Sequence, residues 1–406
     1  MNQGTKSGFP AGGGEVGPLS LVGAPTRAGQ IPVSTAAGRG EWADVPAARY
    51  SPIQSTYNLT ESSFRRGRAA LATAVVGTTP VRIACLGDSM TQGVTSTPQS
   101  SYNWPARLRA VLTLSGRFGT VGEGLAFNTG QTPAQYDPRW VGGAGWSRTG
   151  GGWANQSHWQ AQGGGAGVLD FGPVTCDTIV IYFAQTPIGG VCAVSVDGSP
   201  VGTINCGGNG VSSATFSAGA AGAHTVTVAT PASSAQYAHV LGVGHYVAAA
   251  RNKLEVITGG GTSGARSDIP ISSMDPWYAS QFYDYLNPDI TLYMYGRNDA
   301  QPGGFPGPQF KKNVVTMVKL ARETNSAEIV LIAPPPCNLA NYPYDAAIRD
   351  ALREVSDEHD VAMLDLRRRF GDRWALAPYP LSADTLHPND AGMQAIAVAA
   401  AEILLS

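Results

Sequence analysis

Two polar stretches far apart in the chain carry residue types that a nucleophilic reaction requires. IACLGDSMTQG, residues 83–93, reads as an apolar strand that ends in a tight turn presenting Ser89. Near the C-terminus, DTLHPN has Asp384 three residues before His387. A serine hydroxyl becomes a nucleophile when an imidazole takes its proton and an acceptor fixes the tautomer of that imidazole. An Asp-x-x-His loop would supply both partners from one segment.

Each of these residues also has a structural interpretation. A serine after a strand is more often a helix cap or turn former than a nucleophile, and an isolated histidine beside a helix cap is usually a surface residue. No GxxxxGK[ST] pattern follows Ser89, which argues against a phosphate-binding loop. The remaining histidines lack a comparable setting, since four lie within residues 118–250 and one ends a charged helix: His158, His224, His239, His245 and His359.

A third segment favours the catalytic interpretation. YMYGRNDA follows another apolar strand with Gly296 and Asn298, and the side-chain amide of Asn298 could reach toward Ser89. The alternative is an ordinary Gly-Asn turn. Three separate segments, each with a suitable group after a strand or before a helix, are difficult to ascribe to chance.

The elements that would position these residues are apolar strands alternating with helices. PVRIACLG, LEVITGG, ITLYMYG, EIVLIAPP and VAMLDL read as strands, and helices are expected over residues 103–115, 275–286, 307–325, 343–359 and 389–405. This alternation predicts a parallel sheet covered on both faces. Ligands of such sheets bind at the carboxyl ends of the strands, where Ser89 lies.

Two other regions depart from this rhythm. Residues 118–250 contain short alternating strands with DG and glycine turns, typical of an antiparallel β-sandwich. We expect a jelly-roll-like domain inserted into an α/β domain formed by residues 66–117 and 251–406. Residues 1–65 are rich in glycine and proline and are expected to form an extended arm for attachment or assembly.

GDSMTQG, GRND and DTLHPN resemble blocks one, three and five of the SGNH (GDSL-type) hydrolase family. The resemblance covers the α/β portion and implies a flavodoxin-like three-layer sandwich that hydrolyses esters. It implies that Ser89 is the nucleophile, His387 the general base and acid, and Asp384 the group that orients His387. Asn298 and the backbone N–H of Ser89 would donate to the oxyanion.

The second block of the family should add one more oxyanion donor. VITGGGTSGARSD offers Gly261 and Gly264 at the family spacing, although Gly259 stands where the family has asparagine. The resemblance therefore implies Gly264 as the backbone donor. Asp88 and Asp299 are interpreted as structural, and no metal or organic cofactor is expected.

The ester itself is suggested by the inserted domain. Its leading edge has four tryptophans among glycines, and flat aromatic faces suit stacking on sugar rings: Trp140, Trp146, Trp153 and Trp159. The alternative is that these rings form a core between domains. Because no long apolar lid segment is present, a triglyceride lipase is less favoured. We expect a serine esterase acting on O-acyl, most simply O-acetyl, groups of a bacterial cell-envelope glycan.

The N-terminal arm resembles, in composition, segments of bacteriophage tail fibre and minor tail proteins. The resemblance implies an enzyme carried on a virion and acting at the host surface, with a homotrimer or other homo-oligomer formed through the arm. It would also account for an N-terminal sequence without the apolar stretch of a Sec-type signal peptide. A tail adhesin with little turnover, and a cellular lipase or thioesterase, remain alternatives.

Composition limits the partners. The chain has 406 residues and a net charge of −2, so no basic footprint suggests nucleic acid. No apolar run is long enough to span a membrane, and membrane insertion is not expected. Of five cysteines, Cys192 and Cys206 flank a hairpin signal, where a disulfide could form.

Overall fold

The computed structural model describes residues 30–34, 40–44 and 55–406, with gaps at 78, 97–98, 128–136, 150–157, 252, 261–263, 272–282, 284, 338–340, 372–380 and 385. The chain divides into two compact units, Met1–Tyr50 and Ser51–Ser406. The described part of the first unit is an antiparallel pair of strands, β1 (Gln30–Ser34) and β2 (Gly40–Asp44).

The α/β part of the second unit is built on a seven-stranded sheet. From one edge to the other its strands are β3 (Thr56–Tyr57), β18 (Ala362–Asp365), β17 (Glu328–Ala333), β16 (Ile290–Met294), β4 (Val81–Gly87), β15 (Leu254–Gly260) and β5 (Val121–Gly122). Strand β3 is antiparallel to β18, and the other pairs are parallel. In chain order, the five long strands have the spatial order 2-1-3-4-5 of flavodoxin-like folds. The predicted parallel sheet is confirmed.

The apolar run of β4 is continuous because both faces of the sheet are buried. Ala84 and Leu86 belong to one hydrophobic cluster, and Ile83 and Cys85 belong to a second. Since side chains alternate along a strand, a strand covered on both faces needs apolar residues at every position.

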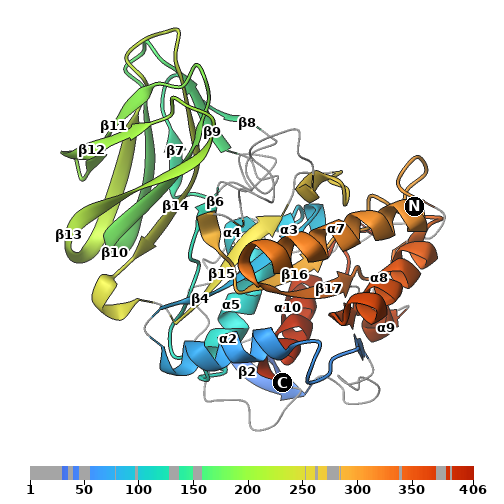
Figure 1. Cartoon of the computed structure of the whole chain (residues 1–406). Coiled ribbons are helices and arrows are strands. Elements are labelled where there is room, and N and C mark those ends of the chain that lie inside the picture. Colours follow the sequence, from blue (N-terminus) through green and yellow to red (C-terminus); the bar gives the residue numbers. More distant parts are fainter. Residues whose placement is uncertain are drawn as a thin grey trace, which may run out of the picture. The chain divides into compact units, whose positions relative to one another are not determined.

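Helices cover the two faces of this sheet and form the outer layers (Figure 1). On the face of the first cluster lie α7 (Gly307–Asn325) and α8 (Asp345–His359), which pack against each other. On the other face lie α2 (Arg65–Val76), α5 (Trp104–Leu114) and α10 (Asp390–Leu405). Short helices occur at α3 (Ser89–Gln92), α4 (Gln99–Tyr102) and α9 (Leu366–Phe370). The helix expected over residues 275–286 falls largely outside the described residues.

Residues 126–246 contain nine antiparallel strands that are hydrogen-bonded into one sheet. The strands are β6 (Ala126–Phe127), β7 (Trp140–Gly142), β8 (Trp146–Thr149), β9 (His158–Gln162), β10 (Val168–Gln185), β11 (Val191–Val196), β12 (Ser199–Asn205), β13 (Gly210–Ala229) and β14 (Tyr237–Tyr246). Register shifts interrupt the β10–β13 pairing between Phe171 and Val174 and between Cys176 and Thr178. The long strands β10 and β13 therefore belong to one continuous sheet that surrounds one apolar cluster. The sandwich expected from the sequence would have two separate sheets.

Two predicted boundaries need correction. Strand β3 pairs with β18, and the second compact unit starts at Ser51, so the arm ends before residue 65. Strand β5 pairs with β15, so the insertion begins after Gly122 instead of at residue 118. Both strands have two residues, which is too short for a periodic pattern to reveal them.

Cys192 and Cys206 are both buried free thiols. The two thiols share a hydrogen bond, which raises the pKa of Cys192. The structure thus brings the two residues together without a disulfide.

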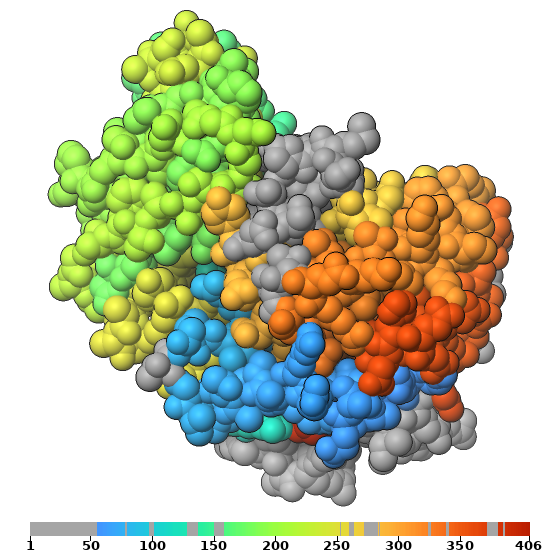
Figure 2. All heavy atoms as spheres, in the orientation of Figure 1, coloured from blue at the N-terminus to red at the C-terminus, as the bar shows by residue number. Residues whose placement is uncertain are grey.

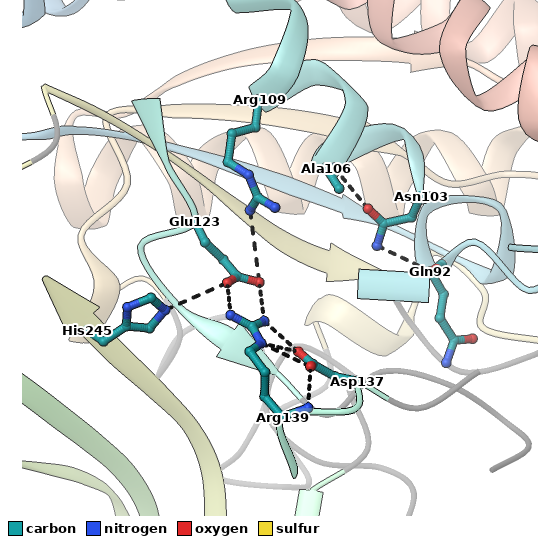
Figure 3. A network of polar contacts seen from close by, with 8 residues as sticks. All are labelled: Gln92, Asn103, Ala106, Arg109, Glu123, Asp137, Arg139 and His245. Atoms are coloured by element: carbon teal, nitrogen blue, oxygen red, sulfur yellow. Dashed lines mark hydrogen bonds and ion pairs between the residues drawn. The ribbon is translucent and has the colours of Figure 1, made fainter. Parts of the chain in front are cut away.

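A polar network connects the nine-stranded part to the α/β part (Figure 3). Glu123, just after β5, accepts hydrogen bonds from both terminal nitrogens of Arg139, at 2.8 and 3.1 Å. Arg139 also binds Asp137, while Arg109 of α5 and His245 of β14 approach Glu123 within 3.9 and 4.0 Å. Burial would raise the pKa of Glu123, but the two arginines outweigh it and hold the pKa at about 2. The carboxylate therefore remains charged and ties the two parts together.

The surface shows the same division. In Figure 2 the nine-stranded part, in green, forms a lobe beside the blue, orange and red surface of the α/β part. The lobes share an apolar cluster in which Leu125, Phe127 and Tyr182 pack with residues of the α/β sheet such as Leu86 and Ile257.

A buried histidine pair in the nine-stranded part leads to a prediction about acid stability. His158 Nε2 lies 3.3 Å from His239 Nδ1, and burial lowers their pKa values to about 3 and about 4. The unfolded chain binds protons below pH 6.5 that the folded chain does not, so stability should fall by a few kcal/mol as pH drops from 6.5 to 4. His239→Gln should reduce this loss.

Urea unfolding at pH 7 and pH 4.5 measures the effect. His359→Gln is the matched control, because His359 is a partly buried histidine at the end of α8. An equal pH-dependent loss of unfolding free energy in wild type and His239→Gln would contradict the prediction.

Candidate active site

Ser89 lies at the carboxyl end of β4, as the first residue of α3. The side chain of Asp88 accepts a hydrogen bond from the backbone N–H of Met90 at 3.0 Å, which caps the turn. Gly93 ends it with φ +86°, a left-handed conformation that favours glycine. A Cβ at Gly87 would collide with Thr91, so a residue without a side chain is required where the strand enters the turn. These constraints hold Ser89 at the rim of the sheet.

Asn103 supports this turn from the start of α5 (Figure 3). Its side chain accepts from the N–H of Ala106 at 2.9 Å and donates to the carbonyl oxygen of Gln92 at 3.5 Å. The cap of α5 is thereby joined to the end of α3. The side-chain amide of Gln92 is buried and has no hydrogen-bond partner among the residues that the structure describes.

His387 and Asp384 lie together in the loop before α10. Asp384 Oδ1 accepts from the backbone N–H groups of Leu386 at 3.0 Å and His387 at 2.6 Å. Asp384 Oδ2 lies 2.7 Å from His387 Nδ1. Burial would raise the pKa of Asp384, but the hydrogen bonds from His387 outweigh it and keep the pKa below its ordinary value. The ionised carboxylate accepts a hydrogen bond from Nδ1–H of the neutral ring, so Nε2 can accept a hydrogen bond from Ser89.

The loop brings His387 to the turn of Ser89. His387 Nε2 lies 3.1 Å from Ser89 Oγ, although the two residues are 298 positions apart. Ala383 donates its N–H to the carbonyl oxygen of His387, and Thr95 donates its hydroxyl to that of Pro388. The structure therefore brings together Ser89, His387 and Asp384, the three residues selected from the sequence.

Asn298 and Gly264 lie in the loops that follow the two strands flanking β4. Asn298 follows β16, and its side-chain nitrogen donates to the carbonyl oxygen of Ala265 at 2.9 Å and approaches Asp88 Oδ2 at 3.4 Å. Gly264 follows β15, is exposed and has φ +82°. Asn298 thus connects the turn of Ser89 to the segment of Gly264.

Asp88 and Asp299 are buried carboxyls beside these groups, and burial raises the pKa of each to about 6. The backbone N–H of Met90 and the charge of Arg297 limit the rise for Asp88, and hydrogen bonds from Ser267 limit it for Asp299. Sequence analysis did not identify Ser267, because a lone serine in a glycine-rich loop carries no distinguishing pattern.

The tryptophans do not form the expected sugar-stacking surface. Trp140, Trp146 and Trp159 are between 6 and 8% exposed and belong to the apolar core of the nine-stranded part. This burial does not fit the expected stacking on sugar rings, and the three rings lie in the core of the nine-stranded part itself instead of in a core between domains. Trp153 lies outside the described residues.

No group of three or more histidine, cysteine, aspartate or glutamate side chains is arranged to hold a metal ion in the part of the chain that the structure describes. Among the same residues, every helix is too short or too polar to cross a membrane.

Comparison with solved structures identifies the fold. A peptidoglycan O-acetylesterase aligns with a TM-score of 0.66 at 17% identity, covering 86% of this chain and 98% of that one. A lipase/acylhydrolase from Enterococcus faecalis has a TM-score of 0.30 at 19% identity, covering 37% of this chain and 74% of its own. A family two carbohydrate esterase from Cellvibrio japonicus has a TM-score of 0.30 at 12% identity, covering 66% and 96%.

A protein-family model matches part of the chain, whereas the search of curated proteins found no match. The sequence model of the GDSL-like Lipase/Acylhydrolase family matches residues 213–395, a segment that begins in β13 and includes Asn298, Asp384 and His387. Residues 213–395 are therefore similar to GDSL-like lipases/acylhydrolases, and the chain shares the fold of a peptidoglycan O-acetylesterase.

Proposed function

We propose that this chain is a serine esterase that removes O-acyl groups, most simply O-acetyl groups, from a bacterial cell-envelope carbohydrate. The observation that carries the proposal is the hydrogen-bonded series from Ser89 Oγ to His387 Nε2, at 3.1 Å, and from His387 Nδ1 to Asp384 Oδ2, at 2.7 Å. This series has the geometry that nucleophilic catalysis by serine requires.

In the first half of the proposed reaction, His387 Nε2 takes the Ser89 proton as Oγ attacks the ester carbonyl carbon. The carbonyl oxygen becomes an oxyanion, which accepts hydrogen bonds from the backbone N–H groups of Ser89 and Gly264 and from the Asn298 side chain. His387 then gives its proton to the departing sugar oxygen, and the carbon–oxygen bond to the sugar breaks. The acyl group remains on Ser89.

In the second half, His387 takes a proton from water, whose oxygen attacks the acyl carbon. Collapse of the second tetrahedral intermediate breaks the bond to Ser89 Oγ, which recovers its proton from His387. The carboxylic acid leaves. Asp384 stays ionised throughout, because it stabilises the imidazolium form of His387 in both halves.

A carbohydrate substrate is supported by the overall fold. A solved structure that shares it over 86% of this chain is a peptidoglycan O-acetylesterase. O-acetylated peptidoglycan is therefore the first substrate to test. Because the described tryptophans are buried, the sugar would have to contact other residues.

We also propose that the enzyme is carried on a phage tail and acts at the host surface. The support is the glycine-, proline- and threonine-rich composition of residues 1–65, which resembles that of tail proteins. Assembly through this arm would give a homotrimer or another homo-oligomer. Light scattering of the full chain and of residues 51–406 would test assembly, since a full chain that remains monomeric contradicts it.

Ser89→Ala tests the enzyme against a binding protein. The substitution should lower the rate of acetate release from O-acetylated peptidoglycan by about 10⁴-fold or more, because no other group can accept the acyl chain. Acetate release from the polysaccharide, measured beside hydrolysis of a chromogenic acetyl ester, gives the result.

Each alternative predicts a different outcome. Equal rates for wild type and Ser89→Ala would overturn the proposed chemistry and favour an adhesin. Hydrolysis restricted to acyl chains longer than about eight carbons, with none on the polysaccharide, would favour a lipase or thioesterase.

Asp384→Asn tests the orientation of the imidazole. The side-chain oxygen would stay on the N–H groups of Leu386 and His387, so the new NH₂ would face Nδ1 and donate to it. The ring proton would then move to Nε2, which could no longer accept from Ser89. We expect kcat to fall by about 10²–10⁴-fold.

The control for this variant is Asp390→Asn, an exposed aspartate at the start of α10 that pairs with Arg107 at 3.2 Å. Its kcat on the chromogenic ester should match the wild-type value. A fall in kcat of similar size in both variants would contradict the assigned role of Asp384.

A further inference from the structure

The segment that carries Gly264 is held at two points by neighbouring residues. Asn298 donates to the carbonyl oxygen of Ala265 at 2.9 Å. The next residue, Asp299, accepts from the backbone N–H of Ser267 at 3.1 Å and from its hydroxyl at 2.6 Å. Two consecutive residues after β16 therefore hold two alternate residues of the segment after β15.

The second of these contacts is supported from helix α7. Asn313 donates its side-chain N–H to Ser267 Oγ at 2.9 Å, and Gln309 donates to Asn313 Oδ1 at 3.0 Å. Asp299 and Ser267 are fully buried, and Asn313 is nearly so. Ser267 Oγ thus has one donor and one acceptor, both of which are fixed by packing.

Gly264 itself has little to hold it. It is exposed, has a left-handed φ of +82°, and no atom of the described residues lies within 4 Å of the position that a Cβ would take. Within the described part of the chain, the direction of its N–H therefore depends on the residues that follow it. Ala265 and Ser267 supply that restraint.

Burying a charged carboxylate costs free energy, so its use to hold a loop is expected where the orientation of that loop matters. Burial raises the pKa of Asp299 to about 6, so at neutral pH the group is ionised in spite of its environment. An ionised carboxylate forms stronger and shorter hydrogen bonds than a neutral acceptor does. The contact of Asp299 with Ser267 therefore serves to fix the orientation of the Gly264 segment, and not to add to the free energy of unfolding.

We propose that Asp299, Ser267 and Asn313 form a positioning clamp that fixes the Gly264 segment so that its backbone N–H donates to the oxyanion. This inference rests on the proposed esterase function and assigns residues to it that lie outside the Ser-His-Asp series. The three residues act through Gly264 and do not touch the substrate.

Ser267→Ala is the test, with Ser356→Ala as its matched control. Ser356 is also a fully buried serine of the α/β part, and its hydroxyl donates to the carbonyl oxygen of Val361, away from the Gly264 segment. Both variants should lose some thermal stability. Ser267→Ala alone should lower kcat on a chromogenic acetyl ester by roughly 10-fold or more, with KM changed less than about twofold, since one oxyanion donor contributes roughly 10²–10³ in rate.

Hydrogen exchange provides a readout independent of turnover. Peptides that cover residues 264–271 should exchange their amide hydrogens faster in folded Ser267→Ala than in wild type, and at the wild-type rate in Ser356→Ala. A normal kcat in Ser267→Ala, or equal falls in kcat in both variants, would overturn the clamp while leaving the esterase in place. Wild type without ester hydrolysis would overturn the proposed function and the clamp with it.

Discussion

The pairing of β4 with a parallel neighbour on each side determines where Ser89, Gly264 and Asn298 lie. Gly87 is in register with Gly260 of β15 and with Met294 of β16. Ser89 follows Gly87 by two residues, and Gly264 and Asn298 each follow their strand by four. Since the three strands end at one level, their loops meet at one rim. A shift in the register of either strand pair would move Ser89 away from Gly264 or Asn298.

The imidazole reaches this rim from a different direction. His387 belongs to no strand, and backbone hydrogen bonds within its loop hold it in place. The loop leads into α10, where the Asn389 side chain caps the helix by accepting from the N–H of Gly392 at 2.9 Å. Helix α10 packs on α5, whose cap supports the nucleophile turn. The distance between Ser89 and His387 therefore depends on the second hydrophobic cluster as well as on the sheet.

Much of this arrangement could be predicted from the sequence because its signals are local. Strands buried on both faces are continuous apolar runs, and the residues that follow them stand out as polar groups in glycine turns. The contacts of Ser267 and Asn313 could not be predicted, because each residue is an ordinary polar side chain until a distant partner is known. The burial of Trp140, Trp146 and Trp159 could not be predicted, because an aromatic residue among glycines suits a binding surface and a core equally. Two-residue strands at the sheet edges, such as β3, are too short to show an alternation of apolar and polar residues.

The apolar cluster shared by the two lobes has a consequence for how such a chain can diversify. Leu125, Phe127 and Tyr182 cover Leu86 and Ile257. Deleting the nine-stranded part would therefore expose an apolar patch beside β4. The insertion is therefore not a detachable accessory. Its outer strands are not constrained in this way, whereas the side that packs on the α/β sheet must remain complementary to that sheet.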